Sequence, residues 1–503
     1  MVFRAVWKGL LSFALLAEVQ ARLTSANSVN TLATESATFP QFNFTQPLDH
    51  FVDTGVTFNQ RFWVSTRHYK SGGPVIVLDG GETSGSGRLS FLDTGIVDIL
   101  ASATNGLGVV LEHRYYGASV PVQNFTTDSL RWLNNEQAAA DSANFMANVK
   151  FEGIDEDLTA PNTPWIYYGG SYAGARSAHM RVLYPDLVFG AIASSGVTYA
   201  TIVDWEYFDI IRQFAPKDCI QQIETTINEI DPLLEKKSTR KLIQSVFGLP
   251  NVTHVEDFAS LLTSPLGGWQ DTNWDPAINS AGFSNFCTAL GKPNNTRVEI
   301  AKGISVNAAV LTYGSYINRT LAARCRAPDT QDDCFGSFDP KQYQVYDLSQ
   351  TWRLWQFQVC TQWGFFMTAP PEGHPKIISK FNTLDYAKQI CKFAYPPGEH
   401  FTVPALPNIT AVNSIGGLKI AADRLAIIDG QADPWRPNTP HADIAKPRPD
   451  TTLRPFKLIE GAVHHWDENG LANRTAEPPR IQAIHAQEVV FVKAWLKDFK
   501  KPA

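Results

Sequence analysis

The chain has 503 residues, of which 44% are hydrophobic and 18% charged, and its formal net charge is −6. This length exceeds one ordinary domain and allows a large buried core, while the composition is typical of a soluble globular protein. The negative charge and the lack of a basic run argue against a nucleic-acid partner.

The first residues have the pattern of a secretory signal. Arg4 and Lys8 supply the positive region, residues 10–17 the apolar run, and residues 19–21 a small-x-small cleavage site. We therefore expect residues 1–21 to be a signal peptide and the protein to be secreted or vacuolar/lysosomal. No later apolar run is long enough to predict a membrane span.

Seven Asn-x-Thr sequons support export, because each is an acceptor for N-glycosylation in a secreted protein. The predicted glycosylation sites are Asn43, Asn124, Asn251, Asn294, Asn318, Asn408 and Asn473.

Six cysteines fit an oxidising compartment and allow three disulfides: Cys219, Cys287, Cys325, Cys334, Cys360 and Cys391. Spacing alone does not choose among the pairings, although Cys325 with Cys334 and Cys360 with Cys391 would close the shortest loops. No C-x-x-C or H-E-x-x-H motif is present, so neither a metal site nor any other cofactor is expected.

The first third of the chain predicts strands that alternate with helices. Residues 58–69 alternate as a half-buried strand would, and residues 74–82 form an unbroken apolar strand that ends in Gly80-Gly81. Residues 108–111 predict another buried strand, and the alanine-rich residues 135–149 a helix. This pattern indicates a doubly wound, mostly parallel sheet.

The next segment predicts a serine at a sharp turn. Residues 165–168 read as a buried strand, Gly169-Gly170-Ser171 as a turn, and residues 172–183 as a helix before Pro185. Strand, glycine turn, serine and helix make up a nucleophile elbow. Position 173 is alanine where G-x-S-x-G has glycine, and the alternative role for Ser171 is that of a helix cap.

Between the two halves of the sheet we expect a helical insertion. Helical periodicity dominates in residues 219–246 and 298–323, and all six cysteines lie in this part. The predicted organisation is a first hydrolase part at 22–198, a helical cap at 199–407 and a second hydrolase part at 408–503. The aromatic residues 352–366 belong to the core of the cap or to a pocket wall.

The sheet then resumes with two strands that end in polar loops. Residues 424–435 carry Asp433, and residues 456–470 carry His464 and His465. An amphipathic helix at 481–499 closes the chain. Serine, acid and histidine in this order, each after a strand, are typical of the α/β-hydrolase arrangement, because parallel strands gather their carboxyl-end loops at one edge.

Two choices stay open at this point. Asp429 ends the same strand as Asp433 and is an alternative acid, although the Asp-Pro-Trp loop favours Asp433. Either His464 or His465 is the base, and the other a packing residue. A histidine within reach of Ser171 would activate the hydroxyl, and a carboxylate would fix the histidine tautomer.

The motifs FTQPLDHF, NQRFW, EHRYYG, YYGGSYAGA, DGQADPW and GAVHHWDENG resemble the serine peptidases that include lysosomal Pro-X carboxypeptidase and dipeptidyl peptidase II. The resemblance implies an α/β-hydrolase domain with a large helical cap and cleavage on the carboxyl side of proline. It implies Ser171 as nucleophile, Asp433 as acid, His464 as base and Trp435 as a wall of the proline pocket. Ala173, Ala175 and Gln362 depart from the family pattern, which puts the subsite preferences in doubt.

We therefore expect a serine peptidase whose partners are proline-containing peptides or proteins. The oxyanion donors would be the N–H groups of Tyr172 and Gly81. Trp435, Phe365 and Glu82 are the predicted substrate contacts, and Glu82, Arg114 and Arg131 are candidates for anchoring a substrate terminus.

Several alternatives stay open. A carboxylesterase or lipase of the same fold and a catalytically inactive binding module are the rival functions. The sequence does not distinguish exo- from endopeptidase action, and it leaves a homodimer as one alternative.

Overall fold

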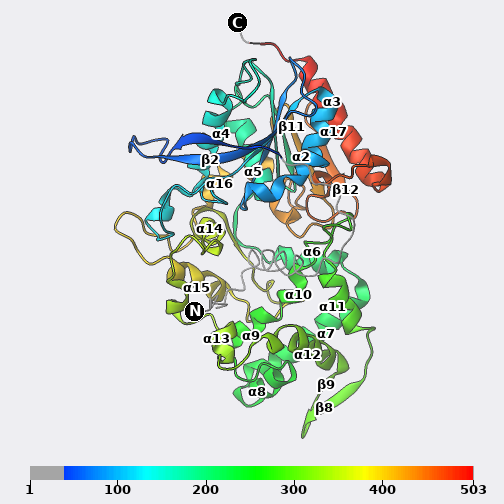
Figure 1. Ribbon diagram of the computed structural model, residues 1–503. Coiled ribbons are helices and arrows are strands. Elements are labelled where there is room, and N and C mark those ends of the chain that lie inside the picture. Colours follow the sequence, from blue (N-terminus) through cyan, green and yellow to red (C-terminus); the bar gives the residue numbers. More distant parts are fainter. Residues whose placement is uncertain (1–38, 502–503) are drawn as a thin grey trace.

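The computed structural model describes residues 39–501 (Figure 1), so the predicted signal peptide lies outside the described residues. Eight strands form one sheet in the order β1-β2-β4-β3-β5-β6-β11-β12. The β1–β2 and β2–β4 pairs are antiparallel, and every later pair is parallel. This topology confirms the α/β-hydrolase fold. The strands are β1 (Gln41–Pro47), β2 (Thr57–Ser65), β3 (Val75–Asp79), β4 (Leu107–Leu111), β5 (Trp165–Gly170), β6 (Gly190–Ser194), β11 (Leu425–Gly430) and β12 (Phe456–Ile459).

The sheet separates two hydrophobic cores. In β3, Val75 and Val77 belong to one core, whereas Ile76 and Leu78 belong to the other, as the period of two along a strand requires. Helices α4 (Asn135–Asn148) and α5 (Tyr172–Leu183) cover the first face, and α3 (Ile96–Thr104) and α17 (Pro479–Lys497) pack together on the second (Figure 1). Because the central strands are covered on both sides, they read as continuous apolar runs.

A large helical segment connects β6 to β11 and lies below the sheet in Figure 1. One part of it has a core of its own, and the other packs against residues 115–133 of the hydrolase part. Its helices are α6 (Glu206–Phe214), α7 (Lys217–Glu235), α8 (Lys237–Val246), α9 (Val255–Leu261), α10 (Ser264–Gly267), α11 (Gly282–Leu290), α12 (Ala308–Thr320), α13 (Gln331–Phe335), α14 (Trp352–Gln358), α15 (Leu384–Ala394) and α16 (Ile409–Asn413).

All three disulfides brace this segment. They join Cys219 to Cys287, Cys325 to Cys334, and Cys360 to Cys391. The last two pairs are the short-loop pairs expected from spacing. Structural disulfides of this kind are typical of exported proteins.

The structure corrects the helical prediction at residues 298–323. The first ten residues of that stretch belong to a hairpin of β8 (Arg297–Ala301) and β9 (Ile304–Asn307), and α12 follows. Gly303, with φ 77°, makes the turn, so the glycine was the missed signal. Residues 219–246 are helical as expected and are divided between α7 and α8. Two short strands, β7 (Thr201–Val203) and β10 (Gly364–Phe366), pair in parallel within the insertion.

Six of the seven predicted glycosylation sites have exposed asparagines, and Asn124 is half-buried. The Asn124 side chain accepts hydrogen bonds from Thr126 and Ser129.

Within residues 39–501, no helix is both long and apolar enough to cross a bilayer.

Candidate active site

Ser171 lies in the tight turn between β5 and α5 with φ 59°, which is rare for a residue other than glycine. The turn is closely packed. A Cβ at Gly169 would lie 2.1 Å from the Ala173 carbonyl oxygen, and a Cβ at Gly174 would lie 2.6 Å from the Ser194 oxygen. Gly174 therefore provides the close contact between helix and strand, and the alanine at position 173 leaves the elbow intact.

The structure brings Ser171, His464 and Asp433 together. Nε2 of His464 lies 2.8 Å from Ser171 Oγ, and its Nδ1 lies 2.9 Å from Asp433 Oδ2. Asp433 is fully buried and His464 nearly so, whereas Ser171 is half-buried. With a proton on Nδ1, the imidazole donates to the carboxylate and leaves Nε2 free to accept the serine proton.

The surroundings of Asp433 keep it ionised. Its Oδ1 accepts the N–H of Trp435 at 2.9 Å, and the Ser195 hydroxyl also hydrogen-bonds to the carboxylate. Burial alone would raise the pKa of Asp433, but the adjacent His464 and these hydrogen bonds lower the pKa below its usual value. The ionised carboxylate can accept a hydrogen bond from Nδ1 of His464.

The two rival residues have other partners. Asp429 lies 2.6 Å from Nδ1 of His441, away from Ser171. Nδ1 of His465 lies 2.9 Å from Glu468 Oε2. Although burial lowers the pKa of His465, Glu468 raises it above the usual value. Among the described contacts of Ser171 Oγ, the imidazole partner is His464.

Sequence reasoning missed Ser195, which follows β6. Ser195 has φ 45°, and its hydroxyl oxygen accepts the backbone N–H of His465 at 2.9 Å. Ser195 thus links the loop that carries Asp433 (the acid loop) to the loop that carries His464 and His465 (the histidine loop). Its position directly after a parallel strand, beside those that carry the acid and the serine, was the available signal.

The turn after β3 lies against the elbow, but the Gly81 N–H donates to Asp79 Oδ1 at 2.9 Å. Asp79 also accepts from Arg176 Nε and the Tyr167 hydroxyl. Burial would raise the pKa of Asp79, but Arg176 lowers that pKa below its usual value. The ionised carboxylate therefore holds the turn through the Gly81 N–H. The prediction of Gly81 as an oxyanion donor does not fit this geometry, because that N–H is already engaged.

Tyr172 begins α5, where a helix leaves its N–H groups without intrahelical acceptors. Its hydroxyl is fixed by His113 Nε2 at 3.0 Å and by Gln358 Nε2 at 2.7 Å. Burial and Arg176 lower the pKa of His113 to about 3, so His113 is neutral and accepts the tyrosine proton. Two hydrogen bonds therefore hold the Tyr172 side chain at the start of α5.

Aromatic side chains gather beside Ser171. The ring of Trp435 makes edge contacts with Phe365 and Tyr207, both at 5.2 Å between centroids. Phe365, Tyr172 and Trp363 belong to one buried cluster. Phe365 has φ 60° and follows a π-helical turn, Val359–Trp363; strained backbone and π-helical turns are both frequent at functional sites.

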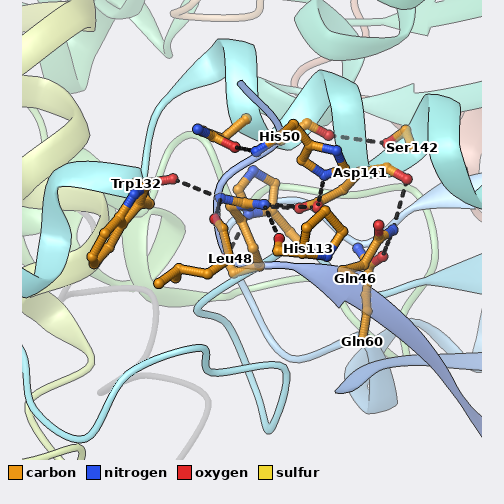
Figure 2. A network of polar contacts seen from close by, with 12 residues as sticks. Gln46, Leu48, His50, Gln60, His113, Trp132, Asp141 and Ser142 are labelled. Atoms are coloured by element: carbon orange, nitrogen blue, oxygen red, sulfur yellow. Dashed lines mark hydrogen bonds and ion pairs between the residues drawn. The ribbon is translucent and has the colours of Figure 1, made fainter. Parts of the chain in front are cut away.

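Arg114 is part of the scaffold. Its guanidinium makes a bidentate ion pair with Asp141, at 2.5 and 2.8 Å, and both side chains are buried. Figure 2 shows Asp141 within a polar network that also contains His50 and Gln46. Arg114 therefore does not fit the role of a substrate anchor.

The other two anchor candidates differ. Arg131 stacks on Trp132 at 3.5 Å. Glu82 is the remaining candidate near the site, because its carboxyl interacts with Arg88, His464 and His465, and burial raises its pKa. One of its oxygens, Oε2, has no hydrogen-bond partner within the described residues.

A second acidic group lies behind the histidine loop. Glu488 of α17 is fully buried, and neither of its oxygens has a hydrogen-bond partner in the described part of the chain. Asp467 accepts from Tyr168 at 2.7 Å and from Ser194 at 2.5 Å. Burial, and then the charge of Asp467, raise the pKa of Glu488 well above 4.5, so Glu488 is protonated in the folded protein in acid.

This placement predicts that stability falls as the pH rises. Above a pH near 4.5 the unfolded chain loses the Glu488 proton while the folded protein keeps it, so stability declines until the folded pKa is passed. We expect Glu488→Gln to raise the Tm at pH 8 by about 2–4 °C or more and to change it by less than ~1 °C at pH 4. Thermal unfolding followed by calorimetry across this pH range measures the effect. The exposed Glu152→Gln is the control, and equal shifts at both pH values would contradict the prediction.

Among residues 39–501, no group of three or more His, Cys, Asp or Glu side chains is arranged to hold a metal ion.

The chain is similar to known serine peptidases over most of its length. A family model described as serine carboxypeptidase S28 matches residues 46–487, from β1 to α17. A probable extracellular serine carboxypeptidase of Arthroderma benhamiae is 42% identical over 499 residues, which cover 92% of this chain and 68% of that protein. The serine protease vicPa of Bipolaris victoriae is 28% identical, covering 91% and 88% of the two chains. The thymus-specific serine protease of Mus musculus is 26% identical, covering 91% and 87%.

Proposed function

We propose that this chain, which belongs to the serine carboxypeptidase S28 family, is a secreted serine peptidase that hydrolyses the peptide bond on the carboxyl side of proline. The observation that supports this most directly is the hydrogen-bonded series from Ser171 Oγ through His464 to Asp433. Three side chains in this order can form and hydrolyse an acyl-enzyme without a cofactor.

In the proposed mechanism, Ser171 Oγ attacks the prolyl carbonyl carbon while His464 Nε2 takes the hydroxyl proton. The carbonyl oxygen becomes an oxyanion, and Asp433 stabilises the imidazolium. His464 then gives its proton to the departing amine as the C–N bond breaks. Water, deprotonated by His464, attacks the ester and releases the acid, and Ser171 regains its proton.

We assign the oxyanion to the N–H groups of Tyr172 and Glu82. The Tyr172 N–H is in the first turn of α5, next to Ser171. Glu82 follows Gly81, where a Cβ would lie 3.3 Å from Ala173 Cβ, so this turn lies over the elbow. Asp79 engages the Gly81 N–H, whereas the Glu82 N–H hydrogen-bonds to the carboxyl of Glu82 itself. The Glu82 N–H therefore becomes the second donor when its own side chain releases it.

The aromatic cluster supports proline as the residue whose carbonyl is attacked. Trp435 and Phe365 are in contact beside the elbow. Proline suits rigid aromatic walls, because its ring loses little entropy on binding and it presents no N–H that would need an acceptor. Secretion is supported by the three disulfides and by the relative described as extracellular.

The test is a set of peptides with one internal proline, in versions with free ends, a blocked amino end and a blocked carboxyl end. Mass spectrometry of the products identifies the cut and the end that the enzyme requires. We expect cleavage after proline with kcat/KM at least about 100-fold above that of the matched peptide with alanine in place of proline. Equal cleavage of the two peptides would contradict proline specificity. Hydrolysis of a simple ester but of no peptide would favour the esterase.

A further inference from the structure

A short stretch of the helical insertion contacts the loop that carries Asp433. We call residues 269–274 the clamp segment. The indole N–H of Trp269 donates to the Ala432 carbonyl at 2.9 Å, and the indole N–H of Trp435 donates to Gln270 Oε1 at 2.7 Å. These two contacts lie on either side of Asp433 in the sequence, so the clamp segment holds the acid loop both before and after the carboxylate.

The same segment contacts the loop that carries His464. The indole N–H of Trp274 donates to the Trp466 carbonyl, and the indole N–H of Trp466 donates to the Thr272 carbonyl, both at 2.8 Å. This reciprocal pair fixes the backbone two residues after His464. Four indole hydrogen bonds therefore join the clamp segment to two separate loops of the sheet.

Asp271 lies between the two sets of contacts. Gln270 precedes it on the side of Trp435, and Thr272 follows it on the side of Trp466. Burial raises the pKa of the Asp271 carboxyl, while His464 and His465 lower it, which agrees with a position close to both imidazoles. The clamp segment thus runs past the acid and the base of the site.

We propose that the clamp segment positions the Asp433 loop and the His464 loop relative to each other. The insertion would then contribute to the geometry of the catalytic site. This inference rests on the proposed triad. A reacting group that is displaced by about 1 Å can lose on the order of 100-fold in rate, and loops hold such groups less well than strands do. Trp269, Gln270, Trp274 and Trp466 are positioning residues in this scheme, since they act through Asp433 and His464.

Trp→Phe substitutions test the proposal, because they remove the indole N–H and keep a large aromatic ring. Trp269→Phe removes one of the two indole hydrogen bonds to the Asp433 loop, and Trp274→Phe removes one of the two to the His464 loop. The matched control is Trp495→Phe, since Trp495 is buried in α17 and donates its indole N–H to the Thr452 carbonyl at 2.7 Å, outside the clamp. Gln270→Met removes the second contact to the Asp433 loop, because Gln270 Oε1 accepts the Trp435 indole N–H and also the Tyr207 hydroxyl.

The main measurement is the rate at which a fluorophosphonate labels Ser171. Tm, kcat and KM are measured for the same variants. We expect Trp269→Phe and Trp274→Phe each to slow labelling and kcat by about tenfold or more at a temperature where all variants are folded, with KM changed less than threefold. Trp495→Phe should lower Tm and leave the labelling rate within twofold.

Labelling rates within twofold of the parent for both clamp variants and Gln270→Met would overturn the proposal, as would an equal loss in Trp495→Phe. Labelling does not depend on proline specificity. Failure of the triad itself would instead appear as continued labelling of Ser171→Ala, so the two failures are distinguishable.

Discussion

Ser171→Ala is expected to lower kcat for a proline-containing substrate by about 10⁴-fold or more. The alanine removes the oxygen that His464 Nε2 approaches at 2.8 Å. Only transition-state binding by the backbone donors would remain. A fluorogenic proline peptide, assayed over hours to reach the residual rate, measures the loss, and unchanged Tm shows that the fold is intact.

The adjacent histidines provide a matched pair for the same experiment. His464→Ala should lose about as much activity as Ser171→Ala, because serine and base act as a unit. His465→Ala should lose less than about tenfold, since its ring lies against Glu468. The reverse order of the two losses would show that His465 is the base, and near-parental activity of Ser171→Ala would refute the triad.

Arg114→Met is expected to lower the free energy of unfolding by about 3–5 kcal/mol, because it leaves the buried Asp141 carboxylate without its cation. Burial alone would raise the pKa of Asp141, and Arg114 and His50 together lower it, so the carboxylate is charged in the folded protein. Denaturant unfolding followed by tryptophan fluorescence measures the change.

Two variants control this measurement. Arg131→Met removes a nearby arginine that stacks on Trp132 outside the buried pair, and its effect should stay within about 1 kcal/mol. Combining Arg114→Met with Asp141→Asn removes the uncompensated charge and should recover part of the loss. If Arg114→Met alone lowers the free energy of unfolding by less than about 1 kcal/mol, the ion pair of Arg114 and Asp141 does not make the expected contribution to stability.

Local patterns in the sequence predicted the central sheet well. The α5 helix begins and ends where the glycines and Pro185 indicated, because the local steric signals and the tertiary packing agree there. The hairpin of β8 and β9 was missed because each strand is short and half-exposed, and its apolar spacing also suits a helix. Only the glycine turn separated the two interpretations.

The site was predicted only in part. The order of strands and loops indicated which loops would bring the serine, the acid and the histidine together, since parallel strands end at one edge. It left the choice between His464 and His465 open, and only the family resemblance implied His464. The pattern could not indicate that Asp79 engages the Gly81 N–H, because that depends on a side-chain rotamer. The contacts of the clamp segment were also not predicted from the sequence. Trp269 and Ala432 are 163 residues apart, and no local rule pairs an indole with so distant a carbonyl.

The placement of the insertion has a consequence for biosynthesis. Ser171 precedes the insertion and His464 follows β12, and 293 residues separate the two. Under the proposed mechanism, a ribosome-bound chain that ends before β12 has its nucleophile but lacks its proton acceptor. We therefore expect such a nascent chain to be inactive toward neighbouring polypeptides until the last strands of the sheet have been made.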